Sequence, residues 1–320
     1  MLANSAWVAT CVQPSYVQRV TAAFGAHVAP LTGPDPINAW VAAATRGLIN
    51  TVINGPLPPT LRFVLVNAVY FTAIWSAPFR RTATVRGRFR PLGGGEGTPC
   101  ALMFRFLDSS CAPGTVVADA PGLGSLVALP YGRSGRFRAV FVLPEAPGAA
   151  ALDALLQPAA LNTLLARALP PPGAAAGVTG VVELFLPRFH AEFGAHDLKP
   201  ALSSLGLGAA FDPWAAPPCF ARMSDEQVYV SSVLHKVVVD VNEEGTEAAA
   251  VTWLTAPTAC AGMPRPRPRR LTFDRPFAML ILDAASDAHA GAQPLLLFGG
   301  RVVRPSFDAS GTHGEYAEPR

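Results

Sequence analysis

Residues 62–75, RFVLVNAVYFTAIW, form an almost continuously apolar run that is rich in β-branched and aromatic side chains. A run of this kind is typical of a strand buried on both faces of a sheet, because a strand with one solvated face alternates polar and apolar residues. Such a strand needs a large apolar core around it. The chain can supply one, since 50% of its 320 residues are hydrophobic and only 15% are charged. We therefore expect one or two folded domains built around a sheet.

The order of the other predicted elements indicates the fold class. Residues 15–28 and 35–53 have helical spacing, with Ser15 as the expected N-cap of the first helix and Pro36 in the first turn of the second. Helices at the front and many strands behind, without strand–helix alternation, favour an α+β fold with mainly antiparallel sheets. The remaining predictions are a hairpin at 125–145, helices at 152–169 and 197–205, and strands at 181–193, 227–241, 277–284 and 294–303.

Charge and cysteine content argue against several functional classes. The net charge is +3, from 25 basic and 22 acidic residues, which is too small to imply nucleic acid as the main partner. No run reaches the ~18 apolar residues that span a bilayer, so no membrane partner is expected. The cysteines show neither CxxC spacing nor paired histidines, so we expect no disulfide framework, no metal site and no cofactor. They are Cys11, Cys100, Cys111, Cys219 and Cys260.

The first residues, MLANSAWVATCVQ, lack the basic region and the long apolar stretch of a signal peptide. We expect a cytoplasmic protein if Met1 is the true start, and an extracellular one if a signal-bearing segment precedes it.

The usual catalytic motifs are absent: the sequence has no GxSxG, HExxH, GxxxxGK[ST] or complete GxGxxG after a strand. Ser231 and His235 would share one face of a strand but would be well separated, which is more typical of buried polar residues than of a nucleophile and its base. We therefore expect that the protein is not an enzyme.

Residues 240–257, DVNEEGTEAAAVTWLTAP, begin with a charged turn and continue through small and β-branched residues to a proline. They read as a strand and not as a helix. Alternation puts small side chains on one face of that strand, where they could lie flat against a core. These small side chains are Thr246, Ala248, Ala250 and Thr252.

Four segments, in this order, resemble the signature segments of the serpins, a family of serine protease inhibitors. They are LVNAVYFTAIW (65–75), LPRFHAEF (186–193), LHKVVVDVNEEGTEAAA (234–250) and RPFAMLIL…LLLFGGRVVRP (275–305). The resemblance implies one serpin-like domain over residues 1–305, with a reactive-centre loop at 243–272 and a flexible tail at 306–320. It also implies a metastable α+β fold, with a large mainly antiparallel sheet, smaller sheets, packed helices and an exposed loop offered to a protease as bait.

In that family the cleaved loop inserts into the large sheet as a new central strand and drags the acylated protease with it, a recognised case of strand addition and of released strain. Insertion needs a flexible hinge and small side chains. Residues 246–256 would span about 36 Å at ~3.3 Å each, and Pro257, which lacks an N–H, belongs outside a central strand. The resemblance assigns the hinge to Glu243, Glu244, Gly245, Thr246, Glu247, Ala248, Ala249 and Ala250.

The position of the scissile bond follows from spacing. The family's spacing from Glu243 places the scissile residue at Ala259, with Cys260 next, whereas counting back from FDRPF (273–277) gives Arg265. We prefer the first count, because the sheet fixes the length that inserts. A small residue suits an elastase-like serine protease, and a cysteine protease is the second class considered. The Pro/Arg run MPRPRPRR (263–270) is expected to be an extended solvated spacer, with polyanion binding by Arg265 to Arg270 as a minority interpretation.

Other positions match supporting residues of the family. Asn67 and His235 match a polar pair that bridges strands where they must part, and Trp75 matches an aromatic residue beneath the top of the sheet. Arg188 and Glu243 resemble the ion pair that positions the hinge, a kind of pair that stabilises only weakly when exposed.

The chain also departs from the family pattern. Its first strand, LANSAWVAT (2–10), matches the family's second strand of the large sheet, and the helices that normally precede it are missing. We therefore expect open apolar surface and an open network at Asn67, and no heparin activation, because the heparin-binding helix is among the missing ones. This reduced form resembles serpins of large DNA viruses, which would imply immune modulation. The alternative function is a non-inhibitory interaction or decoy protein, or a decayed remnant.

Overall fold

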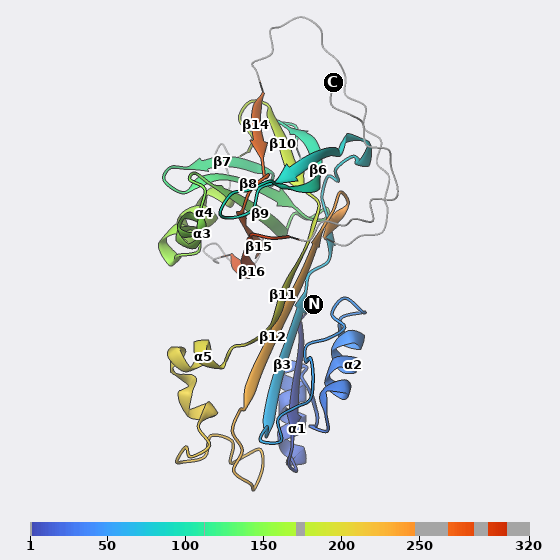
Figure 1. Cartoon of the computed structure of the whole chain (residues 1–320), viewed down its shortest axis with the longest axis vertical. Coiled ribbons are helices and arrows are strands. Elements are labelled where there is room, and N and C mark those ends of the chain that lie inside the picture. The colour runs from blue at the N-terminus through green and yellow to red at the C-terminus, as the bar shows by residue number, and fades with distance from the viewer. Residues whose placement is uncertain (1, 112, 171–176, 247–267, 285–293, 306–320) are drawn as a thin grey trace, which may run out of the picture. The chain divides into compact units, whose positions relative to one another are not determined.

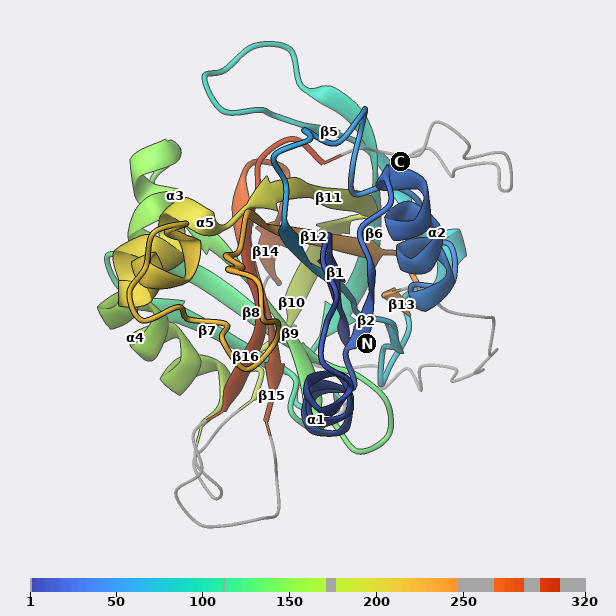
Figure 2. The same ribbon diagram turned by 90° about the horizontal axis from the view of Figure 1, so that it is seen from below.

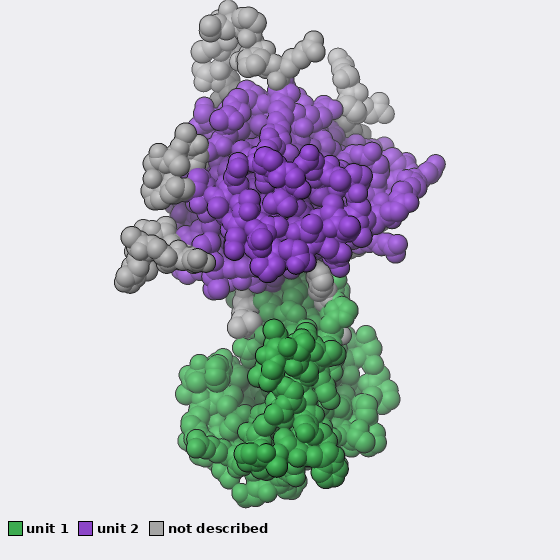
Figure 3. Space-filling model, turned by 90° about the vertical axis from the view of Figure 1, so that its left-hand side faces the viewer, with its two compact units in different colours: residues 1–71, 192–239 green, residues 72–191, 240–320 purple. Residues whose placement is uncertain are grey.

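The computed structural model describes residues 2–111, 113–170, 177–246, 268–284 and 294–305 (Figure 1 and Figure 2). Its contacts divide the chain into two compact units (Figure 3). Unit 1 comprises Met1–Phe71 and Glu192–Val239, and unit 2 comprises Thr72–Ala191 and Asp240–Arg320. The predicted single domain over 1–305 stays a prediction, and the predicted tail at 306–320 lies outside the described residues.

Unit 1 is built on long strands. The strand β3 (Phe63–Tyr70) pairs in antiparallel fashion with β1 (Leu2–Val8) and in parallel fashion with β12 (Ser232–Val241). At the outer side of β1 lies β2 (His27–Pro30), and β11 (Phe189–Asp197) pairs with β12. The first residues of β11 and the last two of β12 belong to unit 2.

The two faces of β3 differ in burial. Val64, Val66 and Ala68 are buried against α2 (Pro34–Ala44), which contributes Ile37 and Val41. On the other face, the side chains of the middle of the strand are only partly buried. The prediction of a strand buried on both faces is therefore wrong for that middle part.

Unit 1 also contains α1 (Pro14–Phe24) and the short α5 (Lys199–Leu202), which is followed by a π-helical turn at Ser203–Leu207 and a 3-10 turn at Gly208–Phe211. A second apolar cluster packs around Phe63 and Phe211.

Unit 2 contains two further sheets. One has the order β14 (Arg269–Thr272), β10 (Val182–Pro187), β6 (Thr98–Leu107) and β5 (Val85–Phe89), in which only the β14–β10 pairing is parallel. The other is antiparallel throughout and has the order β16 (Leu295–Val302), β15 (Phe277–Asp283), β9 (Phe137–Pro144), β8 (Gly124–Pro130) and β7 (Val116–Ala120).

Two helices, α3 (Ala149–Leu155) and α4 (Pro158–Ala168), cover one side of the five-stranded sheet, as Figure 2 shows. Leu152, Leu155 and Leu164 enter the core of that sheet. Unit 2 also contains a 3-10 turn at Arg81–Ala83 and the two short strands β4 (Ala73–Ile74) and β13 (Gly245–Thr246). The predicted α+β class is confirmed, as is the hairpin formed by β8 and β9.

Several predicted helix bounds are wrong, and the backbone explains why. In α1, Pro14 occupies the first turn and Gln13 is the N-cap, so Ser15 does not cap the helix. The predicted helix 35–53 ends at Ala44, because Arg46 and Gly47 adopt positive φ values of 55° and 82°. The predicted helix 197–205 keeps its α-helical form only over α5.

The predicted helix 152–169 is two helices bent by 69° at Gln157, because Pro158 has no N–H to continue the first one. In the described residues, no single helix is long and apolar enough to cross a membrane, and α3 and α4 reach the required length only as this bent pair.

Some strand bounds differ as well. The predicted strand 62–75 is interrupted after Tyr70, so Ala73–Ile74 is a separate strand. The predicted strand 181–193 divides at Arg188, where β10 gives way to β11, and the predicted strand 227–241 begins only at Ser232. The pairing partners explain these divisions. β3 pairs with β12 whereas β4 pairs with β13, and β10 pairs with β6 whereas β11 pairs with β12. β12 begins at Ser232, which is its first residue paired with β3.

Candidate reactive-loop hinge and supporting residues

The last two described residues of the predicted hinge, Gly245 and Thr246, already form a short strand. In β13, Thr246 lies opposite Val241 of β12 on one side and Ala73 of β4 on the other, and both pairings are antiparallel. The chain reverses between β12 and β13 through Asn242, whose Oδ1 accepts hydrogen bonds from the backbone N–H of Glu244 at 2.9 Å and of Gly245 at 3.1 Å. The hinge therefore begins as a fixed turn that leads into a sheet.

Gly245 is required here by close packing. A Cβ atom at this position would lie 2.1 Å from the carbonyl oxygen of Ala73, a backbone atom that has little freedom to move aside. The sequence predicted Gly245 as a flexible hinge. The structure adds a second reason for glycine, which is the close approach of β13 to β4.

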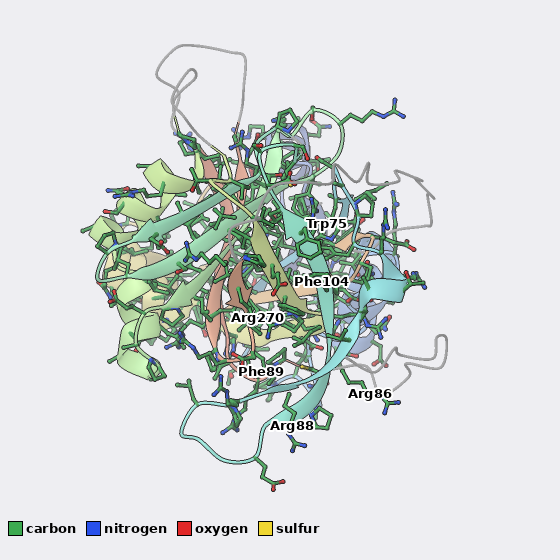
Figure 4. All side chains as sticks on the ribbon, turned by 90° about the horizontal axis from the view of Figure 1, so that it is seen from above. Trp75, Arg86, Arg88, Phe89, Phe104 and Arg270 are labelled. Atoms are coloured by element: carbon green, nitrogen blue, oxygen red, sulfur yellow. The ribbon has the colours of Figure 1, made fainter. Side chains whose placement is uncertain are left out.

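Thr246 is fully buried, and its Oγ1 is 2.7 Å from the hydroxyl of Tyr131. Tyr131 stacks on Trp75 with ring centroids 4.4 Å apart, and burial raises the pKa of the Tyr131 phenol well above its ordinary value. Trp75 in turn donates through Nε1 to the carbonyl oxygen of Asn242 at 2.9 Å. Trp75, which Figure 4 labels, thus supports the turn from which the loop leaves.

Glu243 is buried, with a side chain only 4% exposed. Its shortest polar contact is with Thr84, whose Oγ1 donates to Oε1 at 2.7 Å, while the Nη1 atom of Arg188 lies 3.7 Å from Oε2. The interpretation of this pair as one that positions the hinge stays a prediction; a buried carboxylate of this kind depends strongly on its partners. Sequence reasoning missed Thr84, and no local motif marks it. The neighbouring Glu244 forms an ion pair with Arg81 at 2.7 Å.

In unit 1, Asn67 and His235 lie opposite each other on β3 and β12, and the Oδ1 of Asn67 is 2.7 Å from the Nδ1 of His235. The amide of Asn67 also donates to the Oδ1 of Asn4 on β1 at 2.6 Å. The expectation of an open network at Asn67 is thus wrong, because both ends of its side chain have partners. Sequence reasoning missed Asn4, although the register of β1 against β3 would have indicated it.

Partial burial lowers the pKa of His235 below its ordinary value, while a hydrogen bond with Asn67 acts in the opposite direction. The native state therefore binds fewer protons at this site than the unfolded chain, in which a histidine titrates near pH ~6.5. It follows that stability is retained above that pH and lost as the pH falls through the lowered pKa.

We expect the denaturation midpoint to fall as the pH is lowered from 7.5 to 5, and to fall less in His235→Gln. Urea unfolding followed by circular dichroism at a series of pH values measures this. His196→Gln, which replaces an exposed histidine, is the matched control and should keep the parent's pH dependence. Equal slopes for the parent and His235→Gln would contradict the assignment.

Comparison with known proteins identifies the family to which this fold belongs. A family model described as "Serpin (serine protease inhibitor)" matches residues 1–305. The chain belongs to the serpin family. The recognition made from four segments is thus confirmed, and the family's description is that of an inhibitor and not of an enzyme, as predicted.

Individual relatives agree with this assignment. Putative serpin-Z5 of Oryza sativa subsp. japonica is 33% identical over 297 residues, covering 85% of this serpin and 61% of the relative. Antithrombin-III of Mus musculus is 29% identical over 306 residues, covering 91% and 59%. This serpin thus spans about three fifths of the length of these relatives. They come from a plant and a mammal and give no support to the viral comparison.

Solved structures show the same fold. Tengpin, a thermophilic serpin in the native state, gives a TM-score of 0.74 at 25% identity, covering 94% of this serpin and 72% of that chain. Human thyroxine-binding globulin complexed with its ligand gives a TM-score of 0.75 at 22% identity, covering 96% and 75%.

The remaining predicted residues of this serpin divide into two groups. The first group is the pair Ser231 and His235. The Oγ of Ser231 accepts a hydrogen bond from the backbone N–H of Arg62 at 2.9 Å, and the Nδ1 of His235 contacts Asn67. Neither side chain is therefore engaged as a nucleophile or its base. The second group lies outside the described residues and comprises Glu247, Ala248, Ala249, Ala250, Ala259, Cys260 and Arg265.

The end of the predicted arginine spacer is ordered in a strand. Arg269 and Arg270 belong to β14, where Arg269 pairs with Asp119 at 2.6 Å and Arg270 with Glu183 at 3.2 Å. Both side chains remain exposed, so these two residues agree with an extended and solvated segment, although they are paired in a sheet. Their acidic partners also weaken the polyanion interpretation.

Two further predictions concern metals and disulfides. Among the described residues, Cys11, Cys100, Cys111 and Cys219 are free thiols, and no cluster of His, Cys, Asp and Glu has the arrangement of a metal site. Cys260 lies outside this part of the chain.

Proposed function

We propose that this serpin inhibits an endopeptidase by inserting its cleaved reactive-centre loop between β12 and β3. The observation that carries the proposal is the position of β13, an antiparallel strand whose Thr246 is buried and which directly precedes the proposed inserting segment. In this mechanism the protease cleaves the loop, becomes acylated by it, and is carried along as the loop enters the sheet.

The pairing of β13 supports the route of insertion. In unit 1, β12 and β3 pair directly with each other, from Ser232 opposite Val64 to Val238 opposite Tyr70. In unit 2, the continuations of the same two chain segments no longer pair with each other, because Thr246 pairs with Val241 on one and Ala73 on the other. A strand that extends from Thr246 in the same direction would enter between β12 and β3.

The proposed target is an endopeptidase that accepts a small residue at Ala259, with Cys260 as the second choice for the scissile position. An elastase-like serine protease fits this residue best, and a cysteine protease is the second class. The family description and the relatives' names support inhibition in general. The alternative is a serpin-fold interaction or decoy protein that is cleaved without trapping.

Incubation with a panel of elastase-like, trypsin-like and cysteine proteases tests the proposal. The expected result is a complex with an elastase-like enzyme that survives boiling in SDS, and mass spectrometry of the released peptide should place the cut after Ala259 or Cys260. Clean cleavage in the loop without a complex would favour the decoy alternative. A complex that forms only with a trypsin-like enzyme would move the scissile residue to an arginine.

A further inference from the structure

One end of the five-stranded sheet of unit 2 carries a run of exposed leucines. Among the described residues, the last strand of this sheet, β16, pairs only with β15 (Figure 2). Three consecutive leucines begin β16, with exposed fractions of 62% for Leu295, 38% for Leu296 and 36% for Leu297. We call Leu295–Leu297 the leucine edge. Residues 294–300, PLLLFGG, contain no charged side chain.

The other end strands of the two sheets in unit 2 carry charges. At the opposite end of the same sheet, β7 contains Asp119. In the four-stranded sheet, the end strand β5 contains Arg86 and Arg88, and the end strand β14 contains Arg269 and Arg270. Charged side chains on an end strand discourage pairing with another chain, because the pairing would take them out of water. The leucine edge lacks this protection.

A bulge in β16 determines how the leucine edge is presented. Phe298 lies opposite Ile281 of β15 and Leu296 opposite Leu282, so Leu297 is an extra residue with no opposite neighbour on β15. A bulge can twist an end strand away from another chain. Here, however, Leu296 and Leu297 both keep more than a third of their surface exposed. The bulge therefore leaves the leucine edge open to a partner.

The charged residues that flank the leucine edge have partners within the chain. Asp283, which lies opposite Leu295 in register, accepts hydrogen bonds from Nε and Nη2 of Arg136 at 2.7 and 2.6 Å. Arg301, at the other end of β16, forms an ion pair with Asp153 of α3. A partner therefore needs no opposite charge, and a partner of the same sequence would meet little repulsion. The leucine edge fits an extended, apolar and uncharged strand.

We propose that the leucine edge pairs with the leucine edge of a second copy of this chain. β16 is itself the kind of strand that the leucine edge fits, since residues 294–300 are apolar and uncharged. A two-fold axis through Leu296 makes the two strands antiparallel and puts Leu295 of each copy opposite Leu297 of the other. Each leucine then meets a leucine, and the two five-stranded sheets continue into each other through main-chain hydrogen bonds.

The proposed interface is small, so we expect a weak dimer with a Kd of about 10 μM. Sedimentation velocity of the full chain measures the oligomeric state over a concentration range of about 1 to about 100 μM. We expect a shift from monomer to dimer over this range. Leu296→Lys should raise the Kd by at least about tenfold, because the two-fold axis brings the two new ammonium groups together.

Hydrogen exchange followed by mass spectrometry locates the interface. In the parent, peptides that contain the leucine edge should exchange more slowly at high than at low protein concentration, whereas in Leu296→Lys they should exchange equally at both. Leu205→Lys is the matched control, because Leu205 is 79% exposed in unit 1, and it should dimerise as the parent does. Thermal unfolding establishes that each variant is folded, and Leu295→Lys provides a second reading if Leu296→Lys is not.

The outcomes distinguish the occupants of the leucine edge. A parent that stays monomeric throughout the range, or a dimer that keeps the parent's Kd in both leucine-edge variants, would overturn the proposal. A chain that ends at Pro305 and dimerises where the full chain does not would assign the leucine edge to residues 306–320, and would overturn the proposal as well. The test involves no protease, so its result is independent of loop insertion.

Discussion

Replacing Ala248 by arginine is expected to convert the proposed inhibitor into a substrate. Ala248 lies two residues beyond the buried Thr246, so strand alternation puts its side chain on the same, core-facing side of the inserted loop. An arginine there would bury an unpaired charge, which costs several kcal/mol. A rise of about 3 kcal/mol in the barrier to insertion slows it roughly a hundredfold, so hydrolysis of the acyl-enzyme would win.

The measurement is the fraction of loop cleavages that end in an SDS-stable complex. Cleavage itself should keep the parent's rate, because Ala248 is eleven residues before Ala259. Ala249→Arg is the matched control, since alternation puts its side chain on the opposite face, and it should still trap. Ala248 and Ala249 lie outside the described residues, so the prediction depends on the alternation that begins at Thr246. Equal trapping by the two variants would argue against insertion in this register.

Replacing Gly245 by alanine is expected to have the second largest effect. The new Cβ would lie 2.1 Å from the carbonyl oxygen of Ala73, so β13 must move away from β4. Overpacking of this kind costs about 3 kcal/mol when backbone atoms have to shift. The separation of β13 from β4 would also withdraw Thr246 from its contact with Tyr131.

Hydrogen exchange followed by mass spectrometry reports this change locally. The backbone N–H of Asn242 donates to the carbonyl oxygen of Gly245 at 2.9 Å, so peptides that contain this turn should exchange faster in Gly245→Ala. Gly208→Ala is the control, because a Cβ at Gly208 meets no atom within 4 Å and should leave exchange at the turn unchanged. Unchanged protection in Gly245→Ala would mean that β4 can accommodate the side chain.

Contacts within one short segment could be predicted from the sequence, whereas contacts between distant segments could not. The motif around Glu243 and Gly245 identifies the turn, because its residue types and spacing are local. Thr84 and Tyr131, which hold Glu243 and Thr246, come from unrelated parts of the chain, and only the fold brings them to the hinge.

The bounds of helices show a related limit. Pro158 is visible in the sequence as a helix breaker, yet the apolar spacing continues across it and favours one long helix. The end of α2 depends on the positive φ of Arg46, a conformation that its residue type does not favour. Periodicity therefore located the helical regions but could not set their ends.

The parallel pairing of β3 with β12 has a consequence for the source of the energy in the proposed trapping of a protease. Because β13 runs antiparallel to β12, a loop that continues its direction would be antiparallel to both β12 and β3. Insertion would exchange one parallel ladder for two antiparallel ladders, which are slightly more stable per residue, and would add a full strand of backbone hydrogen bonds. The work done on the protease would then come chiefly from main-chain atoms. A loop of this kind needs no particular side chains to drive it, only side chains small enough not to obstruct it.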